Sequence, residues 1–160
     1  MSLPPFQTLV DAHWRDVARL AHALAGPLDG PDVAQQAWAQ ALAAYPTLQD
    51  ARNLRSWLLT VTSRCAMDIH RGRARRAVPM EELPEGVRPA PAADAALADE
   101  ALWAQVGALP ARQRTAVALR YVVDLDHAAI AAILQTTPGA SRRLVSDALS
   151  TLRKTFGAVP

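Results

Sequence analysis

Cysteine, lysine and aromatic side chains are almost absent from this sequence of 160 residues. Their scarcity limits the fold classes and cellular compartments that fit the protein. Cys65 is the only cysteine, so no internal disulfide can form, as is usual in a reducing compartment. Aromatic residues make up 5% of the chain and hydrophobic residues 51%, which favours closely packed helices over a sandwich or barrel. No apolar run approaches the length of a membrane span, and the N-terminus lacks the pattern of a signal peptide. We therefore expect a cytoplasmic protein without direct membrane insertion.

Patterns that support catalysis or metal binding are also missing from the sequence. The four histidines have no ligand spacing relative to Cys65, so we expect no metal site. No glycine-rich phosphate loop follows a strand, and no nucleophile–base arrangement or pair of carboxylates stands out. We expect no cofactor and no enzymatic activity of the chain by itself.

Apolar residues recur at helical spacing and predict an all-α protein. Helices are expected over residues 9–25, 31–45 and 53–72, with the first break at Gly26-Pro27, and a four-helix unit should begin near Asp94. Residues 77–100 hold four prolines and six acidic residues against one arginine, which is typical of a linker. The expected organisation is two small helical domains, residues 1–76 and 97–160, joined by an acidic, proline-rich linker over residues 77–96.

Residues 109–154 predict a helix-turn-helix. Asp126 can cap a short helix, and Thr137 followed by Pro138 is a strong signal for the start of the next one. The second helix should bury Val145, Ala148, Leu149 and Leu152 and expose Ser141, Arg142 and Arg143 in its opening turns. Such a pair can enter a major groove, although many helical bundles contain a similar pair without binding DNA.

Positive charge is carried almost entirely by arginine and is concentrated in one segment. Sixteen of the 17 basic residues are arginine, and the net charge is only +2. Residues 64–76 contain five arginines against one aspartate, a local charge of +4. This run suits a track for phosphates, although cations are also common at a solvated helix end, where they complement the dipole.

Four segments of the chain stand out by their order and spacing. They are Asp32-Val33-Ala34-Gln35-Gln36-Ala37-Trp38, Leu54-Arg55-Ser56-Trp57-Leu58, Ala66-Met67-Asp68 with the following arginines, and Leu109-Pro110-Ala111-Arg112-Gln113-Arg114. The first three resemble the start, a middle segment and the end of the second domain of ECF-type bacterial sigma factors. The fourth resembles the opening of the fourth domain of that family. The two stretches that contain these segments, residues 31–76 and 109–154, together make up more than half of the chain.

The resemblance implies a role for each surface. The helix start at Asp32, Gln35 and Gln36 would bind core RNA polymerase, although Asp32 could merely complement the helix dipole. The loop over residues 46–52 would capture a flipped promoter base, or it could be only a connection. The resemblance also divides the DNA contacts between two promoter elements. Those of the minus-ten element would be Gln49, Asp50, Asn53, Arg64, Asp68, Arg71, Arg73, Arg75 and Arg76, and those of the minus-thirty-five element Arg112, Ser141, Arg142 and Arg143.

The function that the resemblance implies is an alternative sigma factor that directs promoter-specific initiation. An anti-sigma factor would hold it inactive, and the acidic linker would lie in the polymerase cleft. Departures from the family's usual residues at Gln36, Arg64, Leu144 and Asp147 leave the promoter sequence and the strength of duplex binding open. Two alternatives remain: a sigma-like regulator without promoter activity that acts as a decoy or co-regulator, and a plain helix-turn-helix repressor.

Overall fold

The structure is a computed structural model that describes the backbone of residues 2–75 and 94–156, and every element in these ranges is helical. The all-α prediction is confirmed. None of the helices in the described ranges has the length and hydropathy that a membrane span requires. The elements are α1 (Phe6–Ala44), the 3-10 helix η1 (Tyr45–Thr47), α2 (Leu54–Arg75), α3 (Asp94–Ala108), α4 (Ala111–Tyr121), α5 (His127–Leu134) and α6 (Pro138–Phe156).

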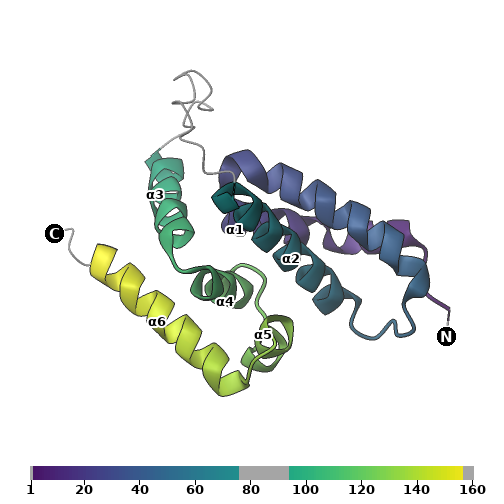
Figure 1. The fold of residues 1–160 in the computed structure, drawn as a ribbon. Helices are drawn as coiled ribbons and strands as arrows, with labels where there is room; N and C mark the ends of the chain where they lie inside the picture. Colours follow the sequence, from purple (N-terminus) through teal and green to yellow (C-terminus); the bar gives the residue numbers. More distant parts are fainter. Residues whose placement is uncertain (1, 76–93, 157–160) are drawn as a thin grey trace.

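Two groups of helices are visible in Figure 1. We refer to α1, η1 and α2 as the N-terminal unit and to α3, α4, α5 and α6 as the C-terminal unit. The predicted linker, residues 77–96, lies outside the described residues except for its last three, which already belong to α3. The expected start of a four-helix unit near Asp94 is therefore confirmed.

A sharp kink divides α1 into two helical halves at Gly26, whose φ of 83° and ψ of 178° are not helical. Glycine fits this conformation because it has no Cβ. The predicted break at Gly26-Pro27 is confirmed, but the expected restart at residue 31 is wrong. Helical geometry resumes at Pro27, whose ring presets the helical φ, and Pro31 lies within the second half.

The two halves of α1 pass very close to each other at Gly30. A Cβ added there would lie 3.1 Å from the Cα of His22 and 3.3 Å from its backbone nitrogen. Glycine therefore permits a hairpin of two helices whose backbones nearly touch, and α2 packs against this hairpin.

Buried leucines and valines of α1 and α2 form the core of the N-terminal unit, with Leu20, Val33 and Leu58 at most 1% exposed. Two polar residues of α2, Thr62 and Ser63, are also fully buried. Their hydroxyls donate to the carbonyls one turn earlier at 2.8 Å, which satisfies them without a partner from another helix.

In the C-terminal unit, α5 and α6 begin with the expected caps. The Asp126 carboxylate accepts from the backbone N–H of Ala129 at 2.8 Å, and Thr137 Oγ1 accepts from that of Ala140 at 3.1 Å. Gln135 ends α5 in the left-handed conformation, with φ 55° and ψ 50°. These local features set the turn between α5 and α6, and α6 packs on α4 and α5.

The two units are in direct contact. One cluster of buried apolar residues extends from α1 and α2 to α4, α5 and α6, and Trp103 of α3 packs against it. The Trp103 ring also meets His22 of α1 edge to face, with 6.2 Å between the ring centroids. The protein therefore adopts a closed arrangement in which the C-terminal unit lies against α1 and α2 (Figure 1).

Candidate nucleic-acid interface

An exposed face of α2 carries part of the arginine-rich segment. Arg64, Asp68 and Arg71 are all exposed, and their spacing of four and three residues places them on one side of the helix. Arg73 and Arg75 belong to α2, but only their backbone is described, and Arg76 lies outside the described residues. The described part of this face carries two cations and one anion.

The same face of α2 looks onto the C-terminal unit across a cavity of about 330 Å³. Arg64, Asp68 and Arg71 line it from α2, and Arg112 lines it from α4. The structure thus brings residues predicted for two different promoter elements to one groove. The remaining lining residues are Met67, Ile133, Leu134 and Gln135.

Arg112 is exposed but already engaged. Its Nη2 donates to the carbonyl oxygen of Leu134 at 3.1 Å. Leu134 is the last residue of α5, where backbone carbonyls lack partners within the helix, so this arginine caps the end of α5. A phosphate contact would use the other guanidinium nitrogens of Arg112.

The loop between η1 and α2 presents Gln49, Asp50 and Asn53, all three of them exposed as a base-reading loop requires. The Asp50 carboxylate accepts from the backbone N–H of Arg52 at 2.9 Å and from its Nε at 3.0 Å. The hydrogen bond from the Arg52 side chain, followed by the one from its backbone, lowers the pKa of Asp50. Asp50 is therefore held as a carboxylate that positions Arg52.

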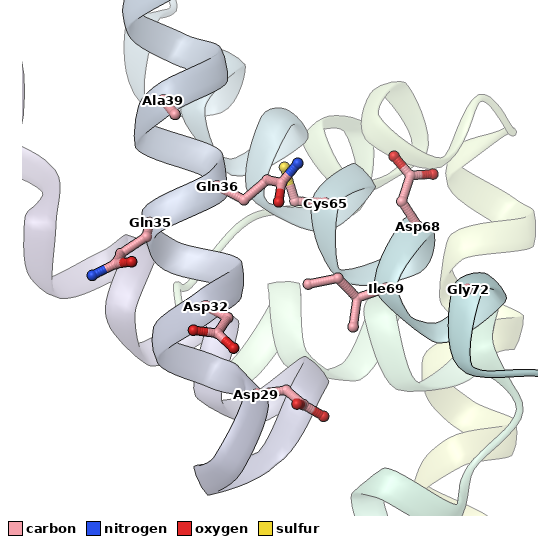
Figure 2. A pocket seen from close by; sticks show the side chains of 9 residues that line it. All are labelled: Asp29, Asp32, Gln35, Gln36, Ala39, Cys65, Asp68, Ile69 and Gly72. Carbon is pink, nitrogen blue, oxygen red and sulfur yellow. The ribbon is translucent and has the colours of Figure 1, made fainter. Parts of the chain in front are cut away.

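An acidic groove lies between the second half of α1 and α2. Asp32, Gln35 and Gln36 are exposed and line this groove of about 880 Å³. Figure 2 shows Gln36 directed toward Cys65 of α2, whereas Gln35 extends away from that helix. The remaining lining residues include Asp29 and Asp68, so three carboxylates surround the groove.

The opening turns of α6 expose Arg142 and Arg143 but not Ser141. Ser141 is 0% exposed, and its Oγ lies 3.0 Å from Nδ1 of His127 on α5. The prediction that this serine faces DNA is therefore wrong. It joins the two helices of the helix-turn-helix, and the arginines that follow it remain available for a groove.

Both halves of the chain match known sequence families. Residues 9–76 match Sigma-70 region 2, and residues 99–152 match Sigma-70, region 4. The RNA polymerase sigma-E factor of Streptomyces coelicolor is 31% identical over 149 residues, which cover 92% of this chain and 81% of that protein. The ECF RNA polymerase sigma factor ShbA of Streptomyces griseus is 32% identical over 133 residues, with 76% and 69% covered. The chain belongs to the ECF family of RNA polymerase sigma factors.

Two solved structures share the fold of this sigma factor. The sigma factor RpoE of Bartonella quintana, solved with the anti-sigma factor NepR, matches with a TM-score of 0.80 at 22% identity and covers 97% of this chain and 98% of that one. CnrH, solved with the cytosolic domain of CnrY, matches with a TM-score of 0.73 at 22% identity, with 97% and 89% covered. Helices α1 and α2 correspond to region 2, and α3 to α6 contain region 4.

Three residues of this sigma factor that interact at these surfaces were not predicted from the sequence. Arg52 could have been found, because an aspartate two residues before an arginine in a loop favours a local turn. Arg114 and His70 lie 2.5 Å apart (Nη1 to Nε2) but 44 residues apart in the chain, and no local pattern pairs them.

Among the described residues, no group of three histidine, cysteine or acidic side chains could hold a metal ion.

Proposed function

We propose that this ECF sigma factor binds core RNA polymerase and positions it at a particular set of promoters. The observation that carries the proposal is the exposure of Arg142 and Arg143 at the start of the second helix of the helix-turn-helix. Arginines at this position can donate two hydrogen bonds to a guanine edge in the major groove. Region 4 would in this way read the minus-thirty-five element.

Region 2 would supply the minus-ten contacts and the opening of the duplex. Arg64 and Arg71 would follow phosphates along α2, since cations that neutralise phosphates supply most of the affinity for DNA. Gln49 and Asn53 have free donors and acceptors for an exposed base edge, and Arg52 adds a guanidinium oriented by Asp50. The base-reading group of the loop would therefore include Arg52.

The acidic groove would bind the polymerase. Asp32 and Gln36 lie on the wall formed by α1, and Asp68 on that formed by α2, so a basic surface fits between them (Figure 2). The chain would perform no covalent step, because the polymerase supplies catalysis. Its place of action would be the cytoplasm, where the polymerase and the promoters are.

An anti-sigma factor is the regulatory partner that we propose. RpoE of Bartonella quintana was solved with the anti-sigma factor NepR, and CnrH with the cytosolic domain of CnrY. Their similarity to this chain supports a protein partner of this kind, which would cover the polymerase-binding face at Asp32 and Gln36. The inducing signal would act on that partner rather than on the sigma factor.

Transcription in a purified system tests the proposal. Core polymerase is mixed with this protein and genomic DNA from the same organism, and the 5′ ends of the transcripts are sequenced. We expect start sites that are absent without the protein and that share one motif upstream of the start and another about 25 base pairs further upstream. An unchanged set of start sites would contradict it.

A decoy that binds polymerase without promoter activity is the second candidate function. The burial of Ser141 favours it, because only two polar side chains in the first two turns of α6, those of Arg142 and Arg143, then remain exposed for base contacts. Binding to core polymerase together with no new start sites would identify a decoy. A plain repressor would bind duplex DNA in the absence of polymerase.

A further inference from the structure

The groove that α2 shares with region 4 gathers positive charge, and we call it the arginine groove. Arg64 and Arg71 line it from α2 and Arg112 from α4, against the one carboxylate of Asp68, so its lining has a net charge of +2. Asp68 follows one of these arginines by four residues and precedes the other by three, a spacing at which ion pairs often form on a helix. Within the described part of the chain, neither Arg64 nor Arg71 has an ion pair or a hydrogen bond from its side chain. Both guanidinium groups can therefore bind an anion that enters the groove.

Arg112 is held in place on the other wall of the arginine groove. Its Nη2 donates to the carbonyl oxygen of Leu134 at 3.1 Å. This bond leaves Nε and Nη1 for other acceptors, and a guanidinium can offer a phosphate two parallel hydrogen bonds. A side chain that is already fixed loses little freedom when a ligand binds, so this arginine favours binding of a phosphate at the groove.

An apolar wall lies beside these cations. Met67 of α2 is partly buried, and Ile133 and Leu134 of α5 are 6% and 5% exposed, with all three lining the arginine groove. Sites for small organic molecules combine such apolar surface with a few polar groups that fix the orientation of the ligand. The wall therefore fits a ligand that carries a flat or apolar group next to its phosphate.

Gln135 adds an amide to the arginine groove from an uncommon backbone conformation. Its φ of 55° and ψ of 50° are left-handed, which brings the Cβ of any residue other than glycine close to the following carbonyl oxygen. Glycine would end α5 in the same way without placing a side chain in the groove. The glutamine side chain lines the groove, and its amide has the donors and the acceptor that recognise the edge of a base.

Volume and charge together limit the ligand to a single nucleotide. The volume of about 330 Å³ is at the lower end of the range for small-molecule sites, which is about 300–1,000 Å³. A phosphate monoester carries a charge of about −1.5 to −2 at pH 7, which complements the net charge of the lining. A phosphodiester in a DNA strand carries about one charge per nucleotide, and the strand would continue beyond the groove.

We propose that the arginine groove binds a nucleoside 5′-monophosphate, whose phosphate lies among the three arginines and whose base packs on the apolar wall beside Gln135. The inference goes beyond the proposed function and rests on it at one point, because Arg64 and Arg71 would also contact the minus-ten strand. A bound nucleotide and that strand would compete for the same two arginines. Promoter binding would in this way respond to the concentration of the nucleotide.

Isothermal titration calorimetry of the full chain with AMP tests the proposal. The ionic strength is about 0.15 M, at which exposed charges more than about 8 Å apart are screened. Inorganic phosphate, adenosine and the dinucleoside monophosphate ApA are titrated in parallel. We expect AMP to bind most tightly, because it alone combines a phosphate monoester with a base that fits the groove. Adenosine should show no binding.

Substitutions of single arginines identify the site. Arg64→Gln, Arg71→Gln and Arg112→Gln should each weaken AMP binding by about tenfold, because each removes a charge-assisted hydrogen bond. Arg153→Gln removes the same charge from the exposed end of α6, outside the arginine groove, and should bind AMP as the parent does. Circular dichroism should show the parent's helix content in Arg64→Gln and Arg71→Gln, since both arginines are exposed. These two variants keep the test valid if Arg112→Gln disturbs the end of α5.

Gln135→Gly distinguishes a role in binding from a role in folding. Glycine adopts the left-handed conformation readily, so the thermal midpoint of the free protein should not fall. The affinity for AMP should decrease several-fold because the amide is lost, whereas the affinity for inorganic phosphate should stay the same.

Three results would overturn the nucleotide site. They are no binding of AMP, equal affinities for AMP and inorganic phosphate, and AMP affinities that are unchanged in all three arginine variants of the groove. Tighter binding of ApA than of AMP would also overturn it, because the groove would then prefer a strand. Neither polymerase nor promoter DNA is present, so such a failure leaves the proposed function intact. A chain that binds AMP through these arginines but directs no transcription would overturn the sigma function alone.

Discussion

Ser141 Oγ lies 3.0 Å from Nδ1 of His127, so the first helix of the helix-turn-helix is hydrogen-bonded to the second at the point where the latter begins. The serine is fully buried and the histidine half-buried. A side chain that would otherwise offer one weak contact to DNA thus fixes the angle at which Arg142 and Arg143 are presented.

Replacing Ser141 by alanine is expected to lower the stability of region 4 without changing its choice of DNA sequence. The change removes one buried hydrogen bond, so the free energy of unfolding should fall by ~1 kcal/mol. Ser146→Ala, on the exposed side of the same helix, controls for the higher helix propensity of alanine. Urea unfolding measures the difference between the two variants, and equal midpoints would show that the contact adds nothing.

The two exposed arginines at the start of α6 are expected to contribute to promoter recognition, unlike a third arginine at the end of the same helix. Arg142→Ala and Arg143→Ala should each lower transcription from promoters that carry the upstream element, and at least one should relax its sequence requirement by ~1–3 kcal/mol. Arg153→Ala, exposed in the last turn, is the control. A library of upstream elements measures the preference. Full activity of the double variant at low polymerase concentration would favour the decoy.

Recognition of the minus-ten element by the loop between η1 and α2 is expected to depend on both Asp50 and Arg52, which Asp50 positions. Arg52→Ala should raise the pKa of Asp50 toward its ordinary value, because the largest cause of its lowering is removed, and NMR titration of the carboxylate can detect this. Asp50→Ala should alter the preference at one or two positions of the element while polymerase affinity stays the same. Identical preferences in a promoter-variant scan would exclude this loop from base reading.

Polymerase affinity is expected to depend on the acidic groove. Asp32→Ala combined with Gln35→Ala should weaken binding to core polymerase by roughly tenfold, because a charge and a polar contact leave the interface. Gln40→Ala, exposed further along the same helix, should bind as the parent does. Fluorescence anisotropy measures the affinities, and circular dichroism checks that the helix is retained. Equal affinities would place the polymerase contact elsewhere.

The buried thiol of Cys65 predicts a particular dependence of stability on pH. Burial, with a smaller contribution from the charge of Asp68, raises the pKa of this thiol above its ordinary value. The unfolded chain therefore ionises at a lower pH than the folded one, and the free energy of unfolding should fall as the pH rises through the ordinary thiol range. In Cys65→Ala that part of the slope should disappear. Urea unfolding at several pH values from 7 to 10 compares the slopes, and parallel curves would refute the expectation.

Features that depend on neighbouring residues could be predicted from the sequence. The caps at Asp126 and Thr137 bond three residues ahead, and the break at Gly26 follows from the conformational freedom of one residue. The position of Ser141 was also open to prediction, since it lies four residues before Val145 and seven before Ala148, on the buried face of α6. Its polar side chain suggests exposure, whereas its helical phase places it on the buried face.

Contacts between the two regions could not be predicted in this way. Arg114 resembles an exposed arginine at a helix start, and its partners His70 and Leu24 lie 44 and 90 residues earlier in the chain. Only the three-dimensional arrangement brings them together. The same holds for the cavity that Arg64 of region 2 shares with Arg112 of region 4.

The close approach of the two halves of α1 at Gly30 limits which residues the sequence can carry at this position. The atoms that a side chain would meet there belong to the backbone of His22, so no rotamer change can make room for it. Any larger residue would have to spread the hairpin and move Asp32, two positions later, relative to α2. The position of the α1 wall of the acidic groove relative to the first half of that helix is therefore set by the close approach of two main chains.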